Sequence, residues 1–277
     1  MLKHKVTPLF IPSELGSLFA MYFTSNSRSH SQCIVHIPAF AEEMNKSRHM
    51  VTMQARAFAE QGYSVLVFDL WGTGDSQGEF SEATWAIWLN NIDAVVKWLQ
   101  SRGSDSISLW GLRAGVLIAM DYLHQYSSEI DKLICWQPVF NGEQFIMQFL
   151  RLRVAAAMMD KNAPQEKTSD LKKQLLEENS VEVAGYQLNP ELVNPMMTIR
   201  AQQLNLQSVK QCHVFELTIG SDLEASYALT KWIKYIEQKD INVSLDIING
   251  SLFWSTQEIS ESPGLIQLSS KRVSECL

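Results

Sequence analysis

Short runs of apolar residues recur along the chain, and segments with apolar residues at helical spacing separate them. Such short runs, bounded by turn residues, are typical of strands buried on both faces of a parallel sheet. Strands are expected at residues 17–23, 33–36, 64–69, 107–110, 133–139, 213–217 and 243–248. Helices are expected at residues 47–61, 81–100, 114–126 and 223–238, and at 256–268, where Pro263-Gly264 interrupts the pattern. This alternation predicts an α/β protein with a mostly parallel central sheet and helices on both faces.

The alternation stops between residues 141 and 207. This stretch holds an amphipathic helical pattern over 143–159, a charged segment over 160–180 and a part rich in Pro and Met around 189–200. We therefore expect one compact body built from 1–140 and 208–277, with a helical cap inserted at 141–207.

The segment Gly111-Leu112-Arg113-Ala114-Gly115 joins a predicted strand to a predicted helix. It has the form G-x-nucleophile-x-G, in which small residues make room for a sharp strand-to-helix turn, and this form predicts the α/β-hydrolase fold. Here Arg113 occupies the nucleophile position. A guanidinium stays protonated and has no lone pair to offer, so Arg113 cannot attack a carbonyl.

The other members of a Ser-His-Asp triad can be sought in chain order, the acid after the seventh strand and the histidine after the eighth. Asp222 and Glu224 are candidate acids, but no histidine follows His213, and the expected histidine position lies in Asn249-Gly250-Ser251-Leu252-Phe253-Trp254. The sequence therefore argues against the usual serine mechanism.

A second motif, Gly74-Asp75-Ser76-Gln77-Gly78, also has the form of a nucleophile turn. It follows a different strand and leads into more loop rather than into a helix. We therefore interpret Ser76 as part of a shaped turn rather than as a nucleophile.

Arg113 needs an anion, because the helix dipole disfavours a cation at a helix start and buried charges are normally paired. One hypothesis is an internal ion pair with Glu42 or Glu43, on the segment that supplies the oxyanion hole in active members of this fold. The other is that Arg113 holds a carboxylate or phosphate of a ligand.

The polar residues 42–49 and the turns around Arg113 supply the candidate site. Arg113, Glu42 and Glu43 are the catalytic candidates, and either glutamate could serve as a general base. His36 and His49 are more typical of structural hydrogen-bonding histidines. The candidate ligand contacts are Phe40, Asn45, Arg48, Leu112 and Gln137.

Composition narrows the function further. With 30 acidic and 23 basic residues the net charge is -7, which argues against nucleic acid as a partner. No apolar run reaches the length of a membrane span, and we expect a cytoplasmic protein without an integral membrane segment. The four cysteines form no C-x-x-C pair and are expected to be reduced thiols. No spacing resembles a metal site, and no cofactor is expected.

Four segments together resemble one family. They are 38–48, 111–115, Trp136-Gln137-Pro138-Val139 and 253–259, and the similarity runs over nearly the whole chain. They look like the exosortase A system-associated hydrolase of type 2, a bacterial α/β-hydrolase family found with exosortase and exopolysaccharide genes. The arginine at the turn belongs to that family's pattern, so the resemblance implies a setting but restores no triad.

These observations leave three hypotheses for the function. The first is a protein that binds an anionic or acyl-bearing small molecule under the cap. The second is a hydrolase with a non-serine mechanism, in which Glu42 or Glu43 activates water and Arg113 holds the developing oxyanion. The third is a non-catalytic protein that binds a partner in the polysaccharide machinery.

Overall fold

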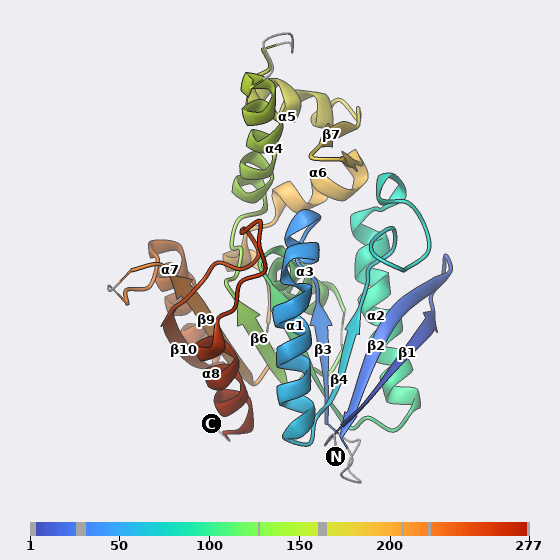
Figure 1. The fold of residues 1–277 in the computed structure, drawn as a ribbon, viewed down its shortest axis with the longest axis vertical. Coiled ribbons are helices and arrows are strands. Elements are labelled where there is room, and N and C mark those ends of the chain that lie inside the picture. The colour runs from blue at the N-terminus through green and yellow to red at the C-terminus, as the bar shows by residue number, and fades with distance from the viewer. Residues whose placement is uncertain are drawn as a thin grey trace.

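A computed structural model describes residues 4–25, 32–126, 128–159, 165–206, 208–220 and 223–275. Its centre is an eight-stranded sheet with the order β1-β2-β4-β3-β5-β6-β9-β10 (Figure 1). The strands are β1 (His4–Pro12), β2 (Ser17–Ser25), β3 (Gln32–Ile37), β4 (Ser64–Phe68), β5 (Ser106–Leu112), β6 (Lys132–Trp136), β9 (Gln211–Thr218) and β10 (Asn242–Asn249). β2 is antiparallel to both β1 and β4, and the pairs from β4 to β10 are parallel. The predicted α/β-hydrolase fold with a mostly parallel sheet is confirmed.

Helices cover both faces of the sheet because side chains alternate along each strand. Val35 and Leu109 point into one core, which α2 (Trp85–Ser101), α3 (Ala114–Gln125) and α7 (Tyr227–Ile236) close. Ile34 and Trp110 point into the other, which α1 (Glu42–Glu60) and α8 (Pro263–Ser274) close. The inner strands are therefore apolar on both faces, and the resulting continuous apolar runs allowed them to be predicted from the sequence.

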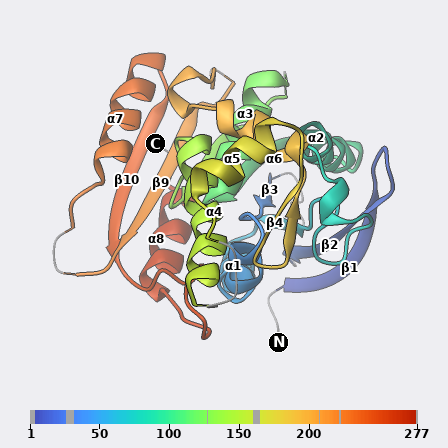
Figure 2. The same ribbon diagram turned by 90° about the horizontal axis from the view of Figure 1, so that it is seen from above.

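The segment between β6 and β9 rises above the edge of the sheet where the parallel strands end (Figures 1 and 2). It contains α4 (Gly142–Met159), α5 (Thr168–Leu176) and α6 (Pro190–Thr198), followed by a short 3-10 turn, η2 (Ala201–Gln203). The sequence pattern did not predict its small hairpin, β7 (Val181–Val183) and β8 (Tyr186–Leu188), since strands of three residues carry almost no periodic signal. No helix of the described residues is both long and apolar enough to cross a membrane.

Four predicted helix starts were wrong, and one of them is that of α7, which begins at Tyr227 rather than near residue 223 because the Ser226 hydroxyl accepts the Leu229 N–H. α1 begins at Glu42 rather than near residue 47, because Glu42 and Glu43 suit the positive end of the helix dipole. α2 begins at Trp85, where the Thr84 hydroxyl accepts a hydrogen bond from the Ile87 N–H; the region around Ser81 forms a separate 3-10 turn, η1 (Phe80–Glu82). The last helix begins at Pro263 and runs to Ser274, because proline favours a first helical position over an interior one.

Candidate functional site

The turn between β5 and α3 is built as the sequence motif requires. Arg113 has φ 55° and ψ −121°, and its N–H donates to the Trp136 carbonyl at 2.9 Å, which ties the turn to the end of β6. A Cβ on Gly111 would lie 2.6 Å from the Val116 nitrogen, and one on Gly115 would lie 2.3 Å from the Ile37 oxygen. Only glycine fits at either position. The strained turn between β5 and α3 is therefore packed closely against the end of β3 on one side and the start of α3 on the other.

The Arg113 side chain pairs with Glu43 and not with Glu42. Its Nε lies 3.2 Å from Glu43 Oε1, and about a fifth of each side chain is exposed. The guanidinium also lies 5.8 Å from the Phe145 ring of α4 and 5.5 Å from the Trp254 ring, which follows β10. Three parts of the structure therefore position the guanidinium: α1 through Glu43, α4 through Phe145 and, through Trp254, the loop where an active member of this fold carries its histidine.

The ion pair is incomplete on both sides. Within the described residues, Glu43 Oε2 is buried without a hydrogen-bond partner, and the two terminal nitrogens of Arg113 have none either. Burial raises the pKa of Glu43, and the Arg113 guanidinium opposes that rise. The outer edge of the guanidinium is therefore free to donate two parallel hydrogen bonds to an anion.

Arg113 lies in the wall of an open cleft of about 550 Å³ between the turn, α4, η2 and the start of α7. Two further cations, Arg200 and Lys231, line the same cleft, together with the amides of Gln144, Gln148, Gln202 and Gln203. No carboxylate belongs to the described lining. Arg200 is paired with Glu143 at 2.5 Å, whereas Lys231 is exposed and makes no ion pair with a described residue. Of the three cations in the lining, Lys231 is thus the one that no described carboxylate pairs with, since Arg113 is paired with Glu43 and Arg200 with Glu143.

Residues 28–214 match the family described as serine aminopeptidase, S33. The chain belongs to the serine aminopeptidase S33 family. Structural similarity agrees, since the fold matches that of several esterases. Est1E of Butyrivibrio proteoclasticus, determined with ferulic acid bound, is 20% identical, with 96% of each chain covered and a TM-score of 0.63. An esterase of Pyrococcus furiosus is 15% identical, with 98% of this chain and 89% of that chain covered and a TM-score of 0.61.

A lipase/esterase of Lactobacillus plantarum is also similar to this S33-family chain. It is 12% identical, with 97% of each chain covered and a TM-score of 0.59. No curated protein matches the sequence. At these identities the solved structures establish the α/β-hydrolase fold and leave the chemistry of this chain to its own residues.

The structure separates the residues that were predicted from the sequence as one site. Of the eight candidates, Arg113 lines the cleft. Glu42 accepts a hydrogen bond from the Tyr186 hydroxyl at 3.3 Å, and Asn45 donates to that hydroxyl at 3.0 Å, so both lie under the β7–β8 hairpin. Gln137 accepts the Leu217 N–H at 2.6 Å and joins β6 to β9.

Two apolar candidates are in the core. Phe40 is 1% exposed and packs edge-on against Phe145 and Phe149 of α4, while Leu112 is fully buried. Both were predicted as ligand contacts. Apolar side chains at these positions point inwards, away from the cleft. The sequence reasoning missed Arg200, Lys231 and Tyr227, for which no local motif exists.

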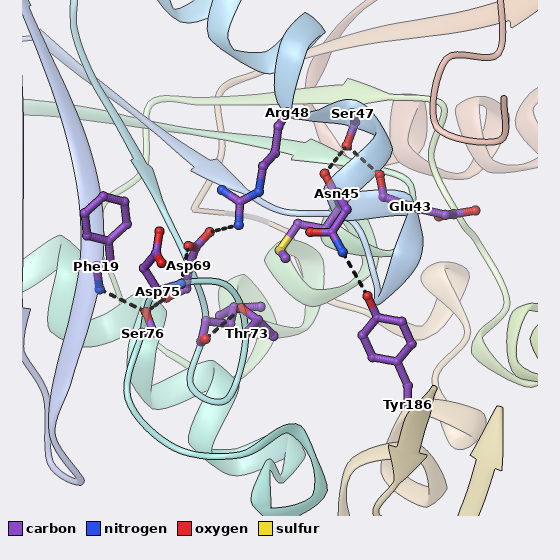
Figure 3. A network of polar contacts seen from close by, with 12 residues as sticks. Phe19, Glu43, Asn45, Ser47, Arg48, Asp69, Thr73, Asp75, Ser76 and Tyr186 are labelled. Atoms are coloured by element: carbon purple, nitrogen blue, oxygen red, sulfur yellow. Dashed lines mark hydrogen bonds and ion pairs between the residues drawn. The ribbon is translucent and has the colours of Figure 1, made fainter. Parts of the chain in front are cut away.

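Arg48, the remaining candidate, belongs to a separate network. Figure 3 shows it reaching from α1 to Asp69, with Nη2 3.0 Å from Asp69 Oδ1. In the adjacent loop the Ser76 hydroxyl donates to the Asp69 carbonyl at 2.6 Å and accepts the Phe19 N–H at 2.9 Å. Ser76 is buried and bonded on both sides, as expected of a residue that shapes the turn.

The last histidine of this S33-family chain and one of the two candidate acids are among the described residues. His213 is fully buried near the start of β9, away from the Arg113 turn, and burial lowers its pKa to about 4. Of the candidate acids, Glu224 is exposed and Asp222 lies outside the described residues.

The cysteines and possible metal ligands add no reactive group. Cys33, Cys135 and Cys212 are buried and form no disulfide with a described residue, and Cys276 lies outside the described residues. Within the described part of the chain, no three His, Cys, Asp or Glu side chains are grouped as metal ligands would be.

Proposed function

We propose that this S33-family protein binds an anionic small molecule in the cleft beside Arg113 and carries out no Ser-His-Asp chemistry. The observation that carries the proposal is the lining of the cleft, which includes three cations and no described carboxylate; the partners of Arg113 and Arg200, Glu43 and Glu143, are outside that lining. Arg113 offers two guanidinium nitrogens, Lys231 offers an ammonium, and the surrounding amides can donate further hydrogen bonds. A carboxylate or a phosphate fits these donors, and so does an acyl-bearing molecule that carries such an anionic group.

The side chains at the triad positions support a binding role. An arginine stands where a serine would attack, and Trp254 contacts it from the loop where a histidine would act. Neither side chain can take up a proton from a nucleophile at neutral pH. The turn therefore has the geometry that orients an anion, but Arg113 and Trp254 take the places of the serine and histidine that would cleave an ester.

The proposal includes the biological setting suggested by the resemblance to exosortase A system-associated hydrolases. On this view residues 1–140 and 208–277 form the core, 141–207 form a cap, and the protein acts in the cytoplasm beside exopolysaccharide production. The position of α4 to α6 above the edge of the sheet, together with the α4 residues in the lining of the cleft, supports that division. The cleft is open rather than occluded, so a small molecule can enter it. A partner from the polysaccharide machinery would then bind in addition to the small molecule and in a way that depends on it.

One observation favours a second candidate, hydrolysis with Glu43 as general base. The Glu43 carboxyl has a raised pKa and an unpartnered oxygen, both of which suit a group that accepts a proton from water. Glu42 is not an equivalent candidate, because its carboxylate accepts a hydrogen bond from the Tyr186 hydroxyl. Replacement of Glu43 by Gln separates the two candidates: it abolishes turnover by a general base, and it strengthens anion binding at an Arg113 released from its partner.

Lys231→Ala tests the binding role with little risk to the fold, because Lys231 is exposed and forms no ion pair with a described residue. We expect wild type to bind octyl phosphate or octanoate at least tenfold more tightly than octanol, as measured by isothermal titration calorimetry. Lys231→Ala should weaken binding of the anions about two- to fivefold, the range of an exposed ion pair. Lys234→Ala on the same helix is the matched control and should change neither affinity. Equal affinity for octanol and the anions would contradict the proposal.

A further inference from the structure

A second, smaller cavity lies on the α1 face of the sheet, between α1 and strands β1, β2 and β4. Its volume is about 140 Å³, and it shares no lining residue with the cleft. Its walls are mostly apolar, and a dry cavity of about 150 Å³ is large enough to hold benzene. The apolar lining residues are Val6, Met21, Phe23, Pro38, Met44, Val51, Val67 and Phe68.

One polar side chain of this apolar cavity has an unused hydrogen-bonding atom. His36, at the end of β3, is 3% exposed, and its Nδ1 lies 3.1 Å from the Trp110 carbonyl. A carbonyl can only accept, so Nδ1 carries the proton and Nε2 presents a lone pair. No described residue bonds Nε2. Burial lowers the pKa of His36 to about 3, so the ring stays neutral.

Two cations lie at the rim of the cavity. Arg56 is exposed and Arg48 is 43% exposed, and both belong to the lining. Asp69 is the one carboxylate among the described residues that line the cavity; its side chain is 4% exposed and pairs with Arg48, as Figure 3 shows. A guanidinium over an aromatic ring is favourable, and Met21 and Phe23 also pack well against rings.

We propose that this cavity is a binding site for a small phenolic molecule. The ring would occupy the apolar volume between α1 and the strands. Its hydroxyl would donate to His36 Nε2, and its open edge would face Arg48 and Arg56. An aliphatic hydrocarbon would leave the histidine lone pair unsatisfied, and an anion would have to bury its charge against the apolar walls.

Phenol and toluene test the proposal on unmodified protein, because they have nearly the same shape and differ in the donor group. We expect saturable phenol binding by ligand-observed NMR and calorimetry, with an affinity about fivefold higher than for toluene, the worth of one neutral hydrogen bond. Saturating octyl phosphate should not displace phenol, since the cleft is a separate site. Equal affinities for phenol and toluene, or no saturable phenol binding, would overturn the proposal.

Thr52→Phe locates the bound molecule. Thr52 is half-buried on α1 and lines the cavity, so a phenylalanine ring there fills the volume from the rim. We expect this variant to lose phenol binding by at least tenfold. Thr230→Phe, at an exposed threonine on α7, is the matched control and should bind as wild type does. Undiminished binding by a folded Thr52→Phe variant would show that phenol binds elsewhere.

Discussion

Gly115→Ala is expected to remove most of the stability of the protein. The new Cβ would lie 2.3 Å from the Ile37 oxygen and 2.5 Å from the Pro38 oxygen, and both of these are backbone atoms of the segment that leaves β3. Neither can rotate away, so α3 would have to move off the sheet and break the turn that places Arg113. Clashes of this kind in a packed interior cost about 4 kcal/mol or more.

Urea denaturation measures this loss, and Gly264→Ala is the control. Gly264 lies in the first turn of α8, where a Cβ would make only an ordinary contact of 3.4 Å with Ile248 Cγ2. Alanine favours a helix over glycine by up to about 1 kcal/mol, so this variant should be as stable as wild type or slightly more so. A Gly115→Ala protein within about 1 kcal/mol of wild type would show that β3 and α3 are not packed as described.

Arg113→Ala is expected to weaken binding of octyl phosphate by about 30-fold or more and to destabilise the fold by about 1–3 kcal/mol. The affinity falls because a charge-assisted, bidentate contact is worth more than an exposed one. The stability falls because Glu43 loses its partner, and the cost is below that of a fully buried pair since both side chains are about a fifth exposed. Alanine keeps a Cβ at φ 55°, so backbone strain is unchanged.

The pH dependence of Arg113→Ala identifies the cause of its instability. Without Arg113 the pKa of Glu43 should rise further, because the burial that raises it is no longer opposed. A carboxyl whose pKa is higher in the folded than in the unfolded state binds protons preferentially when folded. The stability deficit should therefore shrink as the pH falls from 8 towards 5. A double variant with Glu43→Gln should recover part of the deficit at pH 8, and a deficit independent of pH would contradict this explanation.

The sheet could be predicted because the inner strands carry apolar side chains on both faces, as Val35 and Leu109 and their neighbours show. Helix starts were harder: Pro263 marks the start of α8, yet in the sequence it resembles an interruption. From the turn motif and the need of a buried charge for a partner, the sequence suggested an ion pair of Arg113 with Glu42 or Glu43 as one of two hypotheses, and it could not tell the two glutamates apart. Arg200 and Lys231 could not be found in the same way, because the chain brings them to Arg113 from η2 and α7, far away in sequence.

Fluorophosphonate labelling tests most directly whether the Arg113 turn binds rather than attacks. The reagent forms a covalent bond with an activated serine and with no arginine, so intact-mass spectrometry after incubation gives a direct answer. The account predicts no adduct on the wild-type protein under conditions in which a serine esterase of the same fold is fully labelled. A stoichiometric adduct on Ser76, or on any other serine, would contradict it and show that the chain retains a serine nucleophile.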